Sequence, residues 1–430
     1  MTKVTLLLWR TVLLIIAALL IWRVLATGLA AHYAQRLEAG DAEALQQVLT
    51  WQPNHPLGLY EQAIRVAEED TGAALGLLAR AYTANPTAPR PLLAVAALYQ
   101  EQGRTEDADA LVRIADELAP VNPSIQQQIA LYWDQRGDAA TALQHLSRAM
   151  AADRRVGREN LPVILRLAEE PSLRPLLEPI ALEAPKWWPG FFRYATRRAD
   201  NTDVVRYLME LRRRMDTDEI TEEEQTAYQN RLLRDGYPSE AYLAWLNMLE
   251  PTAREELGLL FNGGFELPLS DTGFGWRTRG HKQLDIRPLR TLGGTGAQSL
   301  MVRFNNFEER FNHLAQRLLL QPGTYRLTGT ARVDGLETKG GVRWRLACRG
   351  DSRGLLGESK VFLGRAEWSD FSFDFEVPDA GCETQDLRLV SAGRHGFELD
   401  IDGALWFDNL RIERTAGLDA AARADALRDT

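Results

Sequence analysis

The chain has 430 residues, of which 45% are hydrophobic and 25% are charged. These are ordinary values for globular proteins, and the length suffices for two or three domains. The formal net charge is −9, and no long basic run offsets it. Bulk attraction to nucleic acid is therefore excluded, and we expect no nucleic-acid partner.

An apolar stretch from Leu8 to Ala31 dominates the N-terminus. At about 1.5 Å per residue, a helix of this length crosses a bilayer core of about 30 Å. Lys3 and Arg10 precede it and favour a cytoplasmic N-terminus, while Arg23 lies away from its centre. Residues 1–32 are therefore predicted to anchor an exported body in a membrane. The alternative is a signal peptide, cleaved near the small residues ATGLAA, which would leave a secreted or periplasmic body.

Proline pairs recur between residues 53 and 123 at spacings of 33 and 34. In the later units a glycine, Gly103 or Gly137, is followed five residues later by an alanine, Ala108 or Ala142. Glycine suits the turn between two helices, and proline ends the second helix. Alanine lets the two helices approach closely. The pattern predicts a stack of helical hairpins.

The unit from Leu93 to Pro123 resembles the tetratricopeptide repeat (TPR). The matching positions are Tyr99, Gly103, Ala108, Ala115 and Pro120. The resemblance implies an all-α TPR-like solenoid over residues 38–260, whose concave surface would bind envelope proteins. The aromatic run from Lys186 to Tyr194 fits either a partner-binding patch or the core of a helical hairpin, and the core is the favoured interpretation.

After Phe261 the hydrophobic period changes to two-residue alternation. Apolar and polar residues alternate at 325–333, 342–348, 371–377 and 397–401, which is typical of strands with one buried and one exposed face. About 150 residues of such strands suit a jelly roll of two packed sheets. The predicted fold is multidomain: an N-terminal transmembrane helix, an all-α solenoid and an all-β jelly-roll sandwich over residues 261–415.

Four segments of this second half resemble the carbohydrate-binding (galactose-binding-like) jelly-roll modules found on many glycoside hydrolases. They are NGGFE…GFGW (262–276), LQPGTYRL (320–327), WSDFSFDFEVP (368–378) and GALWFDNLRIE (403–413). The resemblance implies a glycan-binding role and neighbouring first and last strands. It also implies a structural calcium held by Glu266 and Asp408, because this ion prefers oxygen ligands. Alternatively, both carboxylates only accept backbone N–H bonds at turns.

Glycan binding by such a module uses aromatic and polar side chains on an open sheet face. Trp276 is the best candidate for an exposed aromatic side chain. Several arginines are expected to point outward from the strands: Arg303, Arg326, Arg332, Arg343 and Arg345. On one sheet they would form a cationic face, and since arginine suits carboxylates, an acidic polysaccharide is a candidate ligand. The alternative is a face balanced by Asp374, Glu376 and Glu398.

The two cysteines, Cys348 and Cys382, both lie in the predicted jelly roll. In an oxidising compartment such a pair indicates a disulfide. Two buried thiols are the alternative.

No catalytic motif stands out. The sequence contains neither G-x-S-x-G nor H-E-x-x-H, and its six histidines lack metal-ligand spacing. The acidic residues fall in alternating strands or on helix surfaces, without the placed carboxylate pair of a glycosidase. We therefore expect no enzyme and no catalytic cofactor.

These patterns favour a non-catalytic, membrane-anchored scaffold of the cell envelope. Proteins of bacterial exopolysaccharide systems share this domain combination. By analogy, the chain would be a single-pass inner-membrane protein with a periplasmic body that acts in polysaccharide biosynthesis or export. One alternative is a purely structural interaction protein whose jelly roll no longer binds sugar. Another is a cryptic polysaccharide-acting enzyme. Residues 416–430 are an Ala-rich tail that is either a short helix or disordered.

Overall fold

The computed structural model describes residues 3–215, 220–291, 296–349, 354–393 and 395–415. The chain divides into two compact units, which are described separately. The first comprises Met1–Tyr194 and Glu210–Thr217, and the second comprises Ala195–Met209 and Asp218–Thr430. The tail at 416–430, predicted to be helical or disordered, lies outside the described residues.

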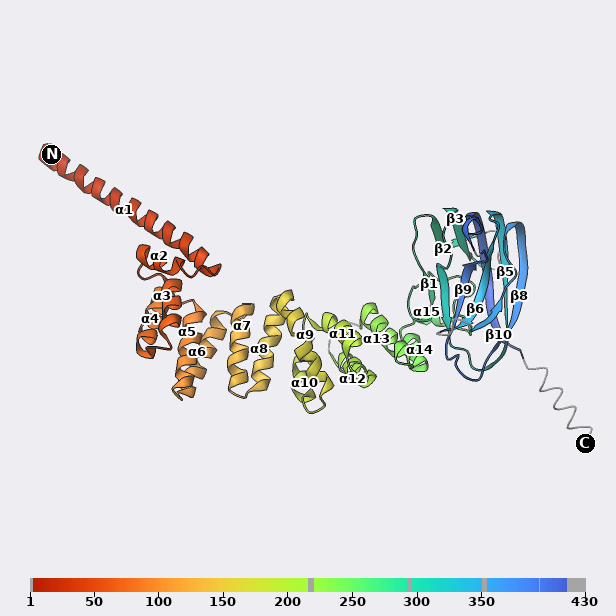
Figure 1. Cartoon of the computed structure of the whole chain (residues 1–430), viewed down its shortest axis with the longest axis horizontal. Helices are drawn as coiled ribbons and strands as arrows, with labels where there is room; N and C mark the ends of the chain where they lie inside the picture. Colours follow the sequence, from red (N-terminus) through yellow and green to blue (C-terminus); the bar gives the residue numbers. More distant parts are fainter. Residues whose placement is uncertain (1–2, 216–219, 292–295, 350–353, 394, 416–430) are drawn as a thin grey trace, which may run out of the picture. The chain divides into compact units, whose positions relative to one another are not determined.

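The first unit begins with one long helix, α1 (Lys3–Glu38) (Figure 1). From Trp9 onward it contains a window with a mean hydropathy of 2.4, long and apolar enough to cross a membrane. A membrane span and an N-terminal signal sequence both fit this helix. Its last turns belong to the helical body, because Ala34 and Leu37 pack in one apolar cluster with α2 (Ala44–Trp51).

The repeated units fold as packed pairs of consecutive helices. The pairs are α3 (Pro56–Val66) with α4 (Thr71–Ala84), α5 (Pro89–Glu101) with α6 (Thr105–Leu118), and α7 (Pro123–Gln135) with α8 (Ala139–Ala152). Proline opens α3, α5 and α7, at a position where no backbone N–H is needed. Gly103 and Gly137 take φ angles of 76° and 79° in the turns, which explains the glycines. Ala108 and Ala142 are buried in α6 and α8, and Ala108 packs in one cluster with Ala96 of α5.

Three further helices follow: α9 (Arg154–Glu169), α10 (Arg174–Leu182) and α11 (Trp188–Arg198). The aromatic run at the start of α11 is core, as favoured from the sequence. Trp188, Phe191 and Phe192 are at most 2% exposed. Trp187 donates its indole N–H to the hydroxyl of Ser147 at 3.0 Å. The run is therefore packing and not a partner-binding patch.

The second unit begins inside the helical region. It contains most of α12 (Thr202–Arg213), together with α13 (Glu222–Arg234), α14 (Pro238–Leu246) and α15 (Pro251–Arg254). Trp245 of α14 is buried and its ring lies 5.1 Å from that of Phe261 and 5.8 Å from that of Phe274. These contacts join α14 to the β region. The border between solenoid and jelly roll at residue 260 stays a prediction.

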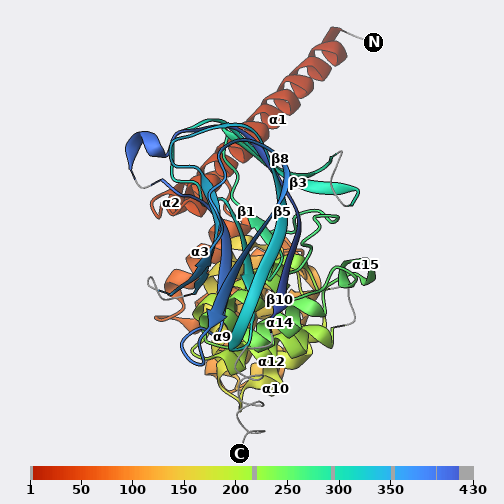
Figure 2. The same ribbon diagram turned by 90° about the vertical axis from the view of Figure 1, so that its right-hand side faces the viewer.

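The β region is an antiparallel sandwich of two five-stranded sheets (Figure 2). Sheet A has the order β1-β4-β9-β6-β7, and sheet B has the order β2-β3-β10-β5-β8. The strands are β1 (Trp276–Thr278), β2 (Leu284–Arg290), β3 (Gln298–Phe307), β4 (Leu314–Leu318), β5 (Gly323–Glu337), β6 (Val342–Cys348), β7 (Leu355–Glu358), β8 (Gly364–Val377), β9 (Gln385–Ser391) and β10 (Ile401–Arg414).

The core between the sheets follows the predicted alternation. In β5, Tyr325, Leu327 and Val333 are buried, and in β6 the buried residues include Trp344 and Leu346. The residues that alternate with them, among them Arg326, Arg332 and Arg345, point away from the core. The alternation therefore assigns most strand residues to the correct face.

One predicted strand is wrong. The segment Gly396–Glu398 forms a 3₁₀ helix, and β10 begins only at Ile401. Gly396 has a φ of 46°, which a strand does not accommodate. Glu398 also passes so close to Gly393 that a Cβ on Gly393 would lie 2.4 Å from the Glu398 carbonyl oxygen. The alternation of residues 397–401 thus arises in a tight turn.

Candidate functional site

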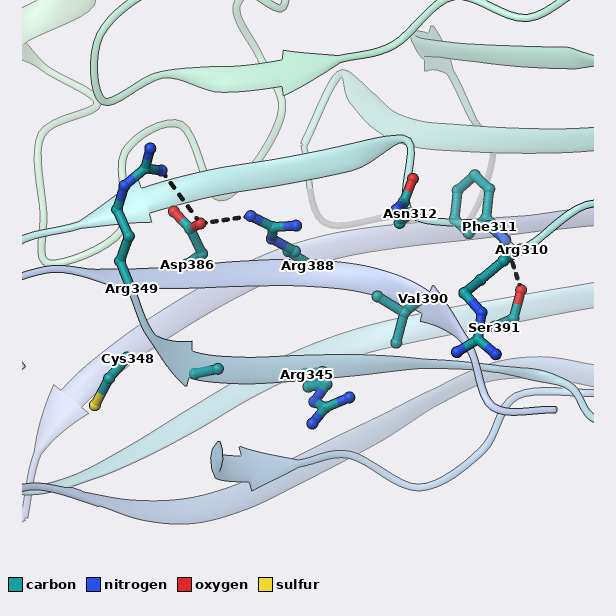
Figure 3. Close-up of a pocket in the computed structure, with 11 residues that line it drawn as sticks. Arg310, Phe311, Asn312, Arg345, Cys348, Arg349, Asp386, Arg388, Val390 and Ser391 are labelled. Atoms are coloured by element: carbon teal, nitrogen blue, oxygen red, sulfur yellow. Dashed lines mark hydrogen bonds and ion pairs between the residues drawn. The ribbon is translucent and has the colours of Figure 1, made fainter. Parts of the chain in front are cut away.

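The outer face of sheet A carries a groove of about 590 Å³ (Figure 3). Its walls come from β6, β9 and the segment that leads into β4. The lining residues are Arg310, Phe311, Asn312, Arg345, Ala347, Cys348, Arg349, Asp386, Arg388, Val390 and Ser391. We call this the basic groove, because four of these side chains are arginines. Figure 3 shows Arg349, Asp386 and Arg388 together at one end, with Arg310 and Ser391 at the other.

Strand pairing places two arginines opposite each other in the middle of the groove. Arg345 of β6 faces Arg388 of β9 in the antiparallel register. Like charges at directly opposed positions destabilise a sheet. Arg345 lies 3.7 Å from Glu358, which also pairs with Arg343 at 2.6 Å. One carboxylate of β7 is thus shared between two arginines of β6.

A single aspartate holds one end of the groove. Asp386 has a side chain that is only 7% exposed. Its carboxylate lies 2.6 Å from Arg388, 3.5 Å from Arg277, 3.5 Å from Arg349 and 4.0 Å from Arg317. We call these five residues the Asp386 cluster. Four guanidinium groups therefore share one carboxylate, which leaves three positive charges without a matching negative charge within the cluster.

The most deeply buried member of this cluster is Arg317, whose side chain is 4% exposed. Burial, together with the neighbouring charges of Arg277 and Arg349, lowers the pKa of Arg317 to about 10. Burial likewise lowers the pKa of Arg277. With a pKa of about 10, Arg317 remains protonated at neutral pH, so it adds to the excess positive charge of the cluster.

Several buried polar atoms of the cluster lack a hydrogen bond. Among the described residues, the Nε atoms of Arg277 and Arg317 and the Oδ1 atom of Asp386 have no hydrogen-bond partner. A buried polar group left unsatisfied costs about 1–3 kcal/mol, and more when it is charged. Native proteins seldom keep such groups without a reason. The cluster is thus strained electrostatically as it stands.

The arginines predicted to form one cationic face lie on two faces. Arg343 and Arg345 belong to sheet A, whereas Arg303, Arg326 and Arg332 belong to sheet B. The idea of a single face is therefore wrong. The reason is topological: β3 and β5 pair with β10, while β6 pairs with β9 and β7, and these long-range pairings leave no local pattern.

Sheet B has a more balanced outer face. Arg326 binds both carboxylate oxygens of Asp374, at 2.6 and 2.9 Å, as the balanced alternative anticipated. Arg332 lies over the ring of Trp406, 5.1 Å from its centroid, and Arg303 is exposed opposite Asp285. A hollow of about 600 Å³ on this sheet is lined by Thr328, Gly329, Thr330, Lys360, Asp370, Phe371, Ser372 and Asn409. It contains one basic and one acidic side chain.

Trp276 is not an exposed platform. It is 1% exposed, and its indole N–H donates to the carbonyl oxygen of Asn262 at 3.0 Å. Its ring packs beside Phe265 and Trp344 in the core. The prediction fails because Trp276 opens a three-residue strand, too short for its alternation to show which face it occupies.

The first and last of the four resembling segments, 262–276 and 403–413, contact each other. Leu410 donates its backbone N–H to the carbonyl oxygen of Gly263 at 2.9 Å. The approach is so close that a Cβ on Gly263 would lie 1.8 Å from the Leu410 carbonyl oxygen. The register of β10 shifts between Asp408 and Arg411, and this bulge frees the Leu410 N–H for the contact.

Both carboxylates proposed as calcium ligands accept backbone hydrogen bonds. Glu266 Oε1 accepts from the N–H groups of Ala297 at 2.8 Å and Gln298 at 3.2 Å. Asp408 Oδ1 accepts from Asn409 at 2.7 Å. Within the described residues no group of three or more His, Cys, Asp and Glu side chains is arranged to hold a metal ion. These contacts match the turn-capping role, and calcium stays a prediction.

Cys348 and Cys382 are joined by a disulfide, with an S–S distance of 2.00 Å. Cys348 ends β6 and lines the basic groove, next to Arg349. The disulfide therefore fixes the wall of the groove where the Asp386 cluster begins.

Most residues of the basic groove and of the Asp386 cluster could not be identified from a motif. Arg277, Arg317 and Arg388 are single arginines in short strands, and Asp386 differs from other strand acids only through its partners. The one local signal is the alternation Asp386, Arg388, Val390 between apolar residues, which marks an outward face of β9.

No protein-family model matches the sequence, and no curated protein matches it. Solved structures with local similarity include a CBM4 module, with 13% identity over 36% of this chain and 99% of that chain and a TM-score of 0.28. The CBM22-1 xylan-binding domain of Xyn10C from Paenibacillus barcinonensis gives 15% identity over 36% and 93%, with a TM-score of 0.27. TmCBM61 in complex with β-1,4-galactotriose gives 19% over 37% and 99%, with a TM-score of 0.26. The strand pairing of the chain itself defines the sandwich.

Proposed function

We propose that this protein is a non-catalytic glycan-binding protein, and that the basic groove on sheet A is where the glycan lies. The groove itself is the observation that carries the proposal. It is open along two strands and combines arginine, asparagine and serine donors with a floor that includes the small apolar residues Ala347 and Val390. Donors of this kind suit sugar hydroxyl and carboxylate oxygens, and a small apolar floor leaves room for a sugar ring.

The length of the groove supports an extended ligand. It follows β9 from Asp386 to Ser391, which at about 3.3 Å per residue spans roughly 17 Å. A single ion or a monosaccharide would fill only part of that length. An oligosaccharide segment of a longer polymer fits this length better. The motif resemblance to carbohydrate-binding modules also supports an oligosaccharide ligand.

The remainder of the chain would place this site in a cell envelope. We propose that α1 anchors the protein in the bacterial inner membrane with the body in the periplasm. The disulfide supports an oxidising compartment. The proposed role is that of a scaffold in polysaccharide biosynthesis or export.

The helices of the first unit offer a surface for protein partners. A hollow of about 730 Å³ lies between α8 and the segments near Pro120 and Pro185. Val121 at its rim is 78% exposed and would contribute apolar contact area to a docked partner. Envelope proteins are the proposed partners of this TPR-like region.

The test is binding of the full chain, in detergent micelles, to a panel of soluble neutral and acidic polysaccharides by affinity electrophoresis. Ala347→Trp fills the basic groove with an indole ring and should abolish binding. Ser372→Trp fills the similarly sized hollow on sheet B and serves as the matched control, which should bind like the parent protein. Retention that survives Ala347→Trp would refute the proposed site.

Two alternative functions make different predictions in the same experiment. A purely structural interaction protein would bind no glycan and would co-purify with envelope proteins. A polysaccharide-acting enzyme would shorten the polymer during incubation, and substitution of one carboxylate would stop the turnover.

A further inference from the structure

The Asp386 cluster has an excess of positive charge that the fold does not neutralise. Four arginines from three strands and one turn surround a single aspartate whose side chain is 7% exposed. Arg345 adds a further positive charge directly opposite Arg388. Removing charged groups from water costs several kcal/mol per ion unless close partners compensate. In this cluster Arg317 is 4% exposed and Arg277 30% exposed, so part of the excess charge is withdrawn from water and destabilises the free protein.

The opposite face of the same sandwich shows that the fold can balance its arginines. On sheet B, Arg326 has a bidentate partner in Asp374, and Arg365 lies 3.2 Å from Asp334. Arg326 is 53% exposed and Arg365 is 77% exposed, against 4% for Arg317 and 30% for Arg277, so water screens the sheet B arginines more than these two. The unbalanced charge belongs to sheet A and is concentrated at one end of the basic groove.

The lining of the groove is poorly suited to a neutral sugar chain. Neutral glycans are held mainly by aromatic rings, which offer large apolar contact area. The one aromatic residue among the lining residues described is Phe311, which is fully buried. Trp276 and Trp344 lie in the core. Binding strength in this groove must therefore come from charge-assisted hydrogen bonds.

We propose that the Asp386 cluster is a recognition site for the acidic groups, carboxylate or sulfate, of an anionic glycan that lies in the basic groove. This inference rests on the proposed glycan-binding function and names the ligand class for that site. An anionic group seated beside Arg349 and Arg388 would offset one or more of the three unmatched positive charges of the cluster. The net charge of −9 gives no bulk attraction to polyanions, so recognition is local to the groove.

Asp386 has a definite role in this scheme. In the free protein its carboxylate is the internal counter-ion that makes the arginine cluster tolerable. The carboxylate also repels an incoming anion, and it occupies the guanidinium groups of Arg349 and Arg388 that the anion would bind. Substitution by asparagine should therefore lower the stability of the free protein and at the same time strengthen anion binding. A residue that merely supported the local structure would weaken both.

The experiment measures binding of the full chain, in detergent micelles, to four polymer probes. Each probe is tested at low and at high salt. The probes are polygalacturonate, dextran sulfate, unmodified dextran and polyglutamate. The variants are Arg388→Ala, Asp386→Asn and the control Arg326→Ala on sheet B. Melting temperatures are recorded for each variant with and without polygalacturonate, because a ligand that binds the folded state raises them.

We expect polygalacturonate or dextran sulfate to bind and dextran to be excluded, with the preference between the two anions identifying carboxylate or sulfate as the favoured group. Arg388→Ala should weaken binding about tenfold, the effect of losing one charge-assisted hydrogen bond. Arg326→Ala should stay within about twofold, as for an exposed ion pair. Asp386→Asn should bind several-fold more tightly, and high salt should weaken every interaction.

Other outcomes overturn the inference in distinguishable ways. Binding of neutral dextran that Arg388→Ala leaves unchanged but Ala347→Trp abolishes would refute the anionic ligand while keeping the groove as a glycan site. Equal binding of polyglutamate would point to an acidic protein instead of a glycan. Binding of none of the sugar polymers would refute the proposed function itself. Weaker anion binding by Asp386→Asn would refute the role of the Asp386 cluster in anion recognition.

Discussion

The disulfide between Cys348 and Cys382 should make the free energy of unfolding of the sandwich depend on redox conditions. The bridge links the end of β6 to the segment before β9 across a sequence separation of 34 residues. The perturbation we consider is the double substitution Cys348→Ser and Cys382→Ser. It removes the cross-link while leaving both strands and the apolar core intact.

The expected magnitude follows from loop closure in the unfolded chain. For 34 residues the chain-entropy relation gives about 13 cal/mol/K, or about 4 kcal/mol at 25 °C. At a typical urea dependence of about 2–3 kcal/mol/M, this lowers the midpoint of the sandwich transition by about 1–2 M. The first unit contains neither cysteine, so its transition should not move.

The assay is urea unfolding of the full chain followed by tryptophan fluorescence, with and without a reducing agent. The parent protein should lose stability on reduction, and the double variant should be indifferent to it. Equal midpoints for the oxidised parent, the reduced parent and the variant would refute the reasoning. A shift of the first unit's transition would show that the two units do not unfold independently.

Three further predictions concern other parts of the second unit. Gly273 has a φ of 52°, and a Cβ there would lie 2.2 Å from Trp245 Cδ1, so Gly273→Ala should cost about 2–4 kcal/mol through left-handed strain and overpacking. The control is Gly280→Ala, because no heavy atom outside the neighbouring residues lies within 4 Å of a Cβ added there. Equal melting temperatures for Gly273→Ala and Gly280→Ala would contradict the packing account. The hydrogen bond from Arg206 lowers the pKa of Glu240 below its ordinary value of 4.5; its contribution to stability is therefore complete above pH 4.5 and lost as the pH falls through the folded-state pKa. Glu240→Gln should flatten the acid side of the stability profile, whereas an unchanged profile would show that the pair contributes nothing. Glu266→Ala should lower the melting temperature because two backbone N–H groups lose their acceptor. A chelator should shift the parent and spare that variant if Glu266 holds calcium, and should shift neither if it only caps the turn.

Local periodicity predicted the elements well but not their pairing. The 34-residue repeat placed the helix pairs, because proline, glycine and alanine each act within one hairpin. Alternation placed Trp344 and Leu346 in the core for the same local reason. The allocation of Arg326 and Arg345 to opposite sheets depends on which distant strands pair, and no short segment encodes that.

The candidate site was only partly visible for a related reason. Arg345 was found because it alternates with apolar residues in a seven-residue strand. Arg277 and Arg317 lie in strands of three and five residues, where alternation is too short to decide a face. The importance of Asp386 depends on three arginines that are distant in sequence, Arg277, Arg317 and Arg349, so only the folded arrangement reveals it.

The most direct test of glycan binding in the basic groove is arginine footprinting of the full chain. Phenylglyoxal modifies accessible guanidinium groups, and mass spectrometry reads each site with and without a bound acidic polysaccharide. We predict protection of Arg349 and Arg388, and no protection of Arg365 or Arg411, which are 77% and 74% exposed on sheet B. Protection confined to sheet B, or unchanged labelling of Arg388 under saturating glycan, would contradict the account.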